Sequence, residues 1–130
     1  MYRRQGLVHG LVAVLIFLLP SCAWRDWSRS LPGGYELAHT MADYVVISHV
    51  PSHEVVVEGN VRRYKVLDTV IVGYAGKAPA VAGPVRTGYF IIELKGSGKV
   101  YQGLDKKQWL ARLRQCGVRH QPRLEEVPAD

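Results

Sequence analysis

The sequence lacks the residue patterns on which most catalytic and cofactor sites are built. Cysteine occurs twice in 130 residues, as Cys22 and Cys116. No serine lies in a G-x-S-x-G setting, and the stretch 96–98 (GSG) has neither the length nor the following Lys-Ser/Thr of a phosphate-binding loop. We therefore predict that the protein is not an enzyme and has no cofactor and no catalytic residue.

The histidines do not form a recognisable metal-binding pattern either. His49 and His53 have the spacing of two ligands on one helical face, but Pro51 lies between them among β-branched residues and argues against a helix. In a hairpin, His49 would face Glu54 across the turn. We predict no bound metal, and we keep as an alternative an envelope hydrolase that uses His49, His53 and a nearby acid.

Long hydrophobic runs are also scarce, since the only one spans residues 7–19 (LVHGLVAVLIFLL). A membrane-spanning helix needs roughly 20 apolar residues. Arg3 and Arg4 precede this shorter run, and small residues follow it. A basic start, a short apolar core and small residues at its end are the parts of a signal peptide, which we assign to residues 1–21.

The end of this leader, Leu19-Pro20-Ser21-Cys22, resembles the lipobox of bacterial lipoproteins. The resemblance implies that Cys22 carries a diacylglyceryl group and that its amine is freed by cleavage and acylated. Two or more acyl chains give stable membrane anchoring. Ala23 in place of an aspartate after the cysteine implies the outer membrane, facing the periplasm. In the alternative, ordinary cleavage after Ala23 would remove Cys22 and release the protein.

Acidic residues are fewer than basic ones, and this imbalance bears on the partners. Without the leader, 15 Lys and Arg stand against 11 Asp and Glu. Export argues against nucleic acid as a partner and favours an acidic protein surface or anionic lipid, and the alternative is a solvated basic surface that binds no ligand. A lipidated Cys22 could form no disulfide, so Cys116 is expected to be a lone thiol and a small core residue on a helix.

The mature chain is predicted to hold one folded domain, over residues 35–118. Residues 22–34 are expected to be a lipidated tether, in which Trp24 and Trp27 rest at the bilayer interface or one of them packs back onto the domain. The polar stretch 119–130 is expected to be a frayed tail.

Alternation of apolar and polar residues predicts an antiparallel meander of six to seven strands. These strands are expected at 35–40, 44–50, 54–58, 61–67, 69–74, 89–94 and 99–102. The run 69–74 (TVIVGY) does not alternate, so we expect a central strand buried on both faces, with Gly73 at a bulge or a close approach. The last two strands form a hairpin around GSG.

The clearest hairpin signal joins 54–58 to 61–67 through the pair Gly59-Asn60. The implied register places charged residues on one face and apolar residues on the other. The predicted wet face holds Glu54, Glu58, Arg63 and Lys65, and the predicted core face holds Val55, Val57, Tyr64 and Val66.

One helix is predicted after the last strand. Asp105 is a good N-cap with Gln108 at the capping-box position, and Gly117 is placed to end the helix. Helical periodicity puts Trp109, Leu110, Leu113 and Cys116 on the arc that packs on the sheet. Arg112 and Arg114 lie on the wet arc and are our candidate partner-binding residues.

The chain resembles small bacterial lipoproteins of unknown function. The resemblance depends on the series of elements over 89–118, together with 32–35 (PGGY) and 64–66 (YKV). The resemblance implies an α+β fold in which a β-meander is followed by a C-terminal helix. Some similar envelope proteins serve as immunity proteins against toxins. We therefore predict a lipid-anchored binding module for another envelope component, in an immunity or assembly role. The other alternative is a purely structural envelope lipoprotein.

Overall fold

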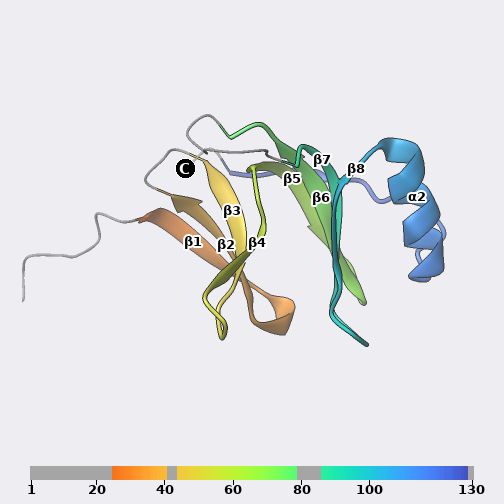
Figure 1. Cartoon of the computed structure of the whole chain (residues 1–130), viewed down its shortest axis with the longest axis horizontal. Coiled ribbons are helices and arrows are strands. Elements are labelled where there is room, and N and C mark those ends of the chain that lie inside the picture. Colours follow the sequence, from red (N-terminus) through yellow and green to blue (C-terminus); the bar gives the residue numbers. More distant parts are fainter. Residues whose placement is uncertain (1–24, 41–43, 79–85, 129–130) are drawn as a thin grey trace, which may run out of the picture.

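The computed structural model describes residues 25–40, 44–78 and 86–128, which form three layers (Figure 1). A sheet of four strands packs on a sheet of five, and the α-helix of this described part covers the outer face of the five-stranded sheet. The predicted class, antiparallel strands in meander order with a C-terminal helix packed on them, is confirmed. The strands form two sheets where a single one was expected.

The first sheet has the order β1-β2-β3-β4, and all its pairs are antiparallel. Its strands are β1 (Arg25–Leu31), β2 (Tyr35–Thr40), β3 (Val45–His49) and β4 (Glu54–Val57). A 3-10 turn, Pro32–Gly34, joins β1 to β2, and both of its glycines have positive φ. The predicted tether over 22–34 is therefore wrong from Arg25 on, because this stretch is a paired strand.

Trp27 explains why β1 belongs to the sheet. Its ring is half-buried against the core between the sheets and stacks on the His39 ring, with centroids 6.0 Å apart. Leu31 at the end of the strand is buried. Of the two expectations for the tryptophans, packing onto the domain holds for Trp27, whereas Trp24 and the whole leader with Cys22 lie outside the described residues.

The second sheet has the order β8-β7-β6-β5-β9. Its strands are β5 (Asn60–Val66), β6 (Val70–Gly76), β7 (Gly88–Glu93), β8 (Val100–Leu104) and the short β9 (Glu125–Glu126). Strand β6 lies in the centre and is buried on both faces, as its unbroken apolar run predicted. Ile71 and Ala75 join the core between the sheets, and Val70 and Val72 join the core under the helix.

The hairpin predicted from Gly59-Asn60 is wrong. Strand β4 pairs with β3, and β5 pairs with β6 and β9, so residues 54–57 and 60–66 belong to different sheets. Where the chain passes from β4 to β5, side-chain oxygens accept backbone hydrogen bonds in place of the ladder of a hairpin. The backbone N–H of Glu58 donates to Gln102 Oε1 at 3.0 Å, and that of Val45 donates to Asn60 Oδ1 at 2.9 Å.

Helix α2 (Lys106–Gln115) has both predicted ends. Asp105 accepts a hydrogen bond from the Gln108 backbone, and the Gln108 side chain accepts one from the Asp105 backbone. At the other end, Val118 N–H donates to the Leu113 carbonyl and Gly117 has φ 88°. This is the Schellman arrangement that a glycine after the last turn favours.

The expected frayed tail over 119–130 is also partly wrong. Strand β9 extends the second sheet by pairing Glu126 with Arg63, and Val127 packs against the core between the sheets. The Lys65 ammonium donates to the Glu125 carboxylate, and this hydrogen bond and charge lower the pKa of that carboxyl. The apolar residues Leu124 and Val127 explain the docking, since each contacts one of the two cores.

Candidate functional site

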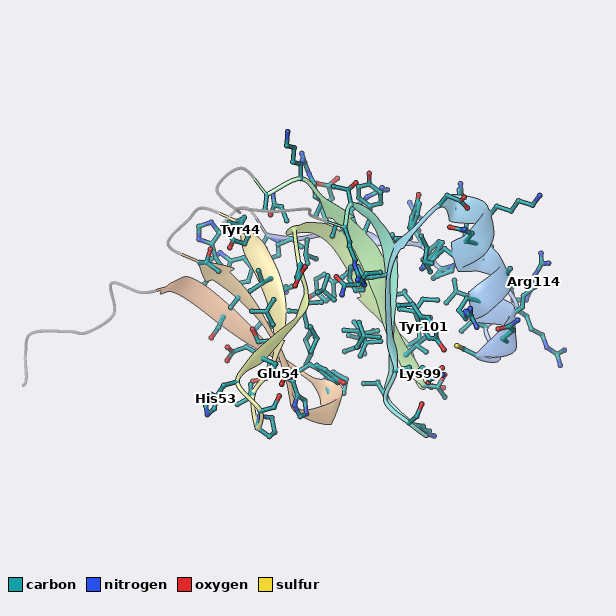
Figure 2. All side chains as sticks on the ribbon, in the orientation of Figure 1. Tyr44, His53, Glu54, Lys99, Tyr101 and Arg114 are labelled. Atoms are coloured by element: carbon teal, nitrogen blue, oxygen red, sulfur yellow. The ribbon has the colours of Figure 1, made fainter. Side chains whose placement is uncertain are left out.

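The two predicted partner-binding residues lie on different sides of helix α2. Arg114 is exposed and extends outward from the helix (Figure 2). Arg112 is half-buried: its Cζ lies 4.5 Å from the centre of the Tyr101 ring, and it donates to Gln115 Oε1. The helix therefore presents Arg114 fully to a partner, whereas Arg112 also contributes to packing.

Arg114 belongs to a cluster that the prediction did not include. Together with Arg119 and His120 it borders a shallow hollow of about 180 Å³, and all three are exposed. The apolar part of the hollow comes from Leu110, Leu113 and Val118. An apolar floor with a basic rim fits an acidic segment that carries an apolar side chain.

The positive charge of the chain is concentrated in one segment, which includes helix α2. Residues 106–123 carry six lysines and arginines and no aspartate or glutamate: Lys106, Lys107, Arg112, Arg114, Arg119 and Arg123. The rest of the chain after residue 21 has nine basic and eleven acidic residues, so this basic segment holds the entire positive excess. Every one of the six except Arg112 is exposed.

The histidines of the alternative hydrolase occupy the β3–β4 turn. His49 faces Glu54 in the ladder as expected, its Nδ1 lies 2.8 Å from Ser52 Oγ, and its ring contacts that of Tyr35 at 5.1 Å. His53 is exposed in the turn with φ 59°. Within the described ranges no group of three or more His, Cys, Asp or Glu side chains could hold a metal ion.

Cys116 lies near a carboxylate beneath the end of the helix. Its Sγ is 3.8 Å from Glu93 Oε2, and both residues border a hollow of about 310 Å³. Partial burial, followed by the charge and the hydrogen bond of Glu93, raises the pKa of the thiol, while Arg112 opposes the shift. A raised pKa keeps the thiol protonated and unreactive at neutral pH.

Another hollow lies at the end of the sandwich where β5 begins, and we call it the arginine groove. It has a volume of about 610 Å³, within the range of small-molecule sites. Among the described residues it is lined by His39, Tyr44, Val45, Asn60, Val61, Arg62, Arg63, Tyr74, Gly76, Lys77, Glu126, Val127 and Pro128. Tyr44 marks this end of the molecule in Figure 2, and Lys99 marks the opposite end.

Sequence reasoning missed this groove because it placed Arg63 in the wrong pair. In the predicted hairpin, Arg63 lay opposite Val56 and shared a wet face with Glu54 and Glu58. In the structure its guanidinium lies over the Tyr74 ring, with Cζ 5.4 Å from the centroid. The adjacent cations Arg62 and Arg63 were the available signal, but their convergence depends on a register shift that no local pattern encodes.

None of the described helices is long and apolar enough to cross a membrane. No protein-family model, curated protein or solved structure matches the chain. The functional argument therefore depends on the residues themselves.

Proposed function

We propose that this protein is an exported, lipid-anchored binding module of the bacterial envelope that docks an acidic protein partner on its basic segment. The observation that carries the proposal is the confinement of the positive excess to residues 106–123. Opposite charges across an interface accelerate encounter and select the partner. The apolar floor beside Arg114 and Arg119 would hold the partner once it has arrived.

The position of β1 supports a protein partner over the anchoring bilayer. Cys22 precedes Arg25 by three residues, which reach at most about 10 Å. This short link attaches to the first sheet, whereas helix α2 lies on the far face of the second sheet (Figure 1). Packed layers are about 10 Å apart, more than the Debye length of about 8 Å at physiological ionic strength. The cations on helix α2 would therefore lie beyond the electrostatic range of a membrane that faces the first sheet.

Attachment is tested separately from docking. An alkyne palmitate supplied to growing cells should label the wild type and leave Cys22→Ser unlabelled. A labelled Cys22→Ser protein, or a wild type found only in the soluble fraction, would contradict lipid anchoring while leaving the docking proposal intact.

Docking is tested by photo-crosslinking in cells, with the reactive residue at position 114. The expected result is one protein adduct that disappears when Arg119 is changed to Glu, and no such adduct from position 29 on the first sheet. Lys95→Glu with Lys99→Glu is the matched control, because both lysines are exposed in the β7–β8 turn. Crosslinking of position 114 to lipid alone would favour the bilayer as the partner and contradict this proposal.

A further inference from the structure

Two neighbouring arginines line the same groove although consecutive residues of a regular strand point to opposite faces. The β5–β6 ladder shifts register between Val61 and Arg63, so Arg62 has no partner residue in β6. Bulges of this kind change the direction of a side chain and occur next to functional sites. The irregularity at Arg62 therefore gives the groove two cations where a regular strand would give one.

Gly76 supplies the space for one of these side chains. A Cβ built on Gly76 would lie 3.2 Å from Cδ and 3.6 Å from Nη1 of Arg62. The arginine thus extends across a position that holds no side chain. Arg63 is held from another side, by the Tyr74 ring. The ring contact holds the Arg63 guanidinium in place, which lowers the entropy lost when it binds a ligand.

Among the described residues, the cations that line the groove outnumber its carboxylates. Arg62, Arg63 and Lys77 line it together with one carboxylate, Glu126, and among the described residues none of these three cations forms a salt bridge. Asn60 adds a hydrogen-bond donor to the groove. Its Oδ1 already accepts a bond from the Val45 backbone N–H, so its NH2 group is the part that can bind a ligand.

We infer that the arginine groove binds a small polyanion whose charge lies on phosphate or carboxylate oxygens. The planar fork of arginine matches both groups in a bidentate manner, and such charge-assisted bonds are about twice as strong as neutral ones. The volume of about 610 Å³ is large enough for an anion that carries several phosphate or carboxylate groups. This site is separate from the basic segment and does not depend on the docking proposed above.

The test is calorimetric titration of the protein, in nonionic detergent, with pyrophosphate in one arm and citrate in the other. We expect at least one of the two to bind, and its identity distinguishes a phosphate from a carboxylate ligand. Arg62→Ala with Arg63→Ala should weaken binding about tenfold or more, since a bond to a charged group contributes about 1.5–3 kcal/mol. If that variant fails to fold, Arg62→Ala with Lys77→Ala makes the same test with two exposed residues.

Three further variants distinguish a built binding site from general electrostatic attraction. Gly76→Val removes no charge but places a side chain against Arg62, and it should weaken binding several-fold. Lys95→Ala with Lys99→Ala removes two charges from the other end of the molecule, and Arg114→Ala with Arg119→Ala removes two from the basic segment; both should leave the affinity within about twofold. Absence of heat with both anions, or an equal loss in the Lys95/Lys99 control, would overturn the inference.

Discussion

The indole N–H of Trp109 donates a hydrogen bond of 3.2 Å to the backbone carbonyl of Phe90, inside the protein. The β7–β8 ladder is irregular between Tyr89 and Ile91, so Phe90 has no partner residue in β8. Phe90 is paired with Gly73 on the β6 side, so the indole bond is an additional contact that ties the helix to β7. Because the Phe90 side chain belongs to the core between the sheets, this bond connects the helix to a residue of that core.

Trp109→Ala should lower the free energy of unfolding by about 3–5 kcal/mol, because it removes a ring that is 1% exposed together with its hydrogen bond to the Phe90 carbonyl. Trp109→Phe, which keeps a ring but not the N–H, should cost about 1–3 kcal/mol. Urea unfolding measures both, with the exposed Lys107→Ala as the control, expected within about 0.5 kcal/mol. A Trp109→Ala protein as stable as that control would show that the helix is not docked in this way.

Val55 and Val57 distinguish the two-sheet arrangement from the predicted hairpin, in which both would be buried. Val57 is fully buried, whereas Val55 is 50% exposed, because the β3–β4 ladder shifts register between Ile47 and Ser48. Val57→Asp should therefore cost several kcal/mol by burying an unpaired charge, and Val55→Asp should cost less than about 1 kcal/mol. Thermal melts of the two variants, with the exposed Glu54→Lys as a neutral reference, give the answer. Equal damage from both aspartates would contradict the observed pairing.

Gly73→Ala should destabilise the protein by about 1–3 kcal/mol through overpacking. A Cβ at this position would lie 2.3 Å from the Arg63 carbonyl oxygen and 2.5 Å from Cζ of Phe90. The backbone atom cannot move without breaking the β5–β6 ladder. Gly96→Ala is the comparison, because nothing lies within 4 Å of a Cβ there and only its positive φ adds a cost, of about 1 kcal/mol. Chemical denaturation should rank Gly73→Ala as the more harmful change.

Cys116 should react more slowly with iodoacetamide than a free cysteine at the same pH, since burial and Glu93 raise the pKa of its thiol. Glu93→Gln removes one charge that disfavours the thiolate and should shift the rate profile toward lower pH, while Lys95→Gln should leave it unchanged. The raised pKa also links the stability of the fold to pH. The contribution of the Cys116 thiol to the free energy of unfolding is fully present below the pKa of the thiol in the unfolded chain. It is lost as the pH rises through the higher pKa of the thiol in the folded protein. A profile unaffected by Glu93→Gln would contradict this account.

The sequence alone determined the class of the fold and the local elements. The capped helix, the β7–β8 hairpin, the turn at Pro32–Gly34 and the doubly buried run of β6 depend on residues that are neighbours in the chain. Caps, turns and hydrophobic periodicity act over a few residues, so local patterns are sufficient to predict them. The predicted leader, lipobox and Cys22 are of the same local kind and remain predictions.

Only the tertiary structure decided which strands pair and where charges gather. Gly59-Asn60 has the composition of a hairpin turn, but long-range pairing overrides it: β4 pairs with β3, β5 pairs with β6, and Val57 and Val61 are both buried in the core between the sheets. The same competition made a strand of the predicted tether and docked the tail as β9. The arginine groove follows from these long-range choices, because the register shift at Arg62 and the missing side chain of Gly76 act only once β5 and β6 lie side by side.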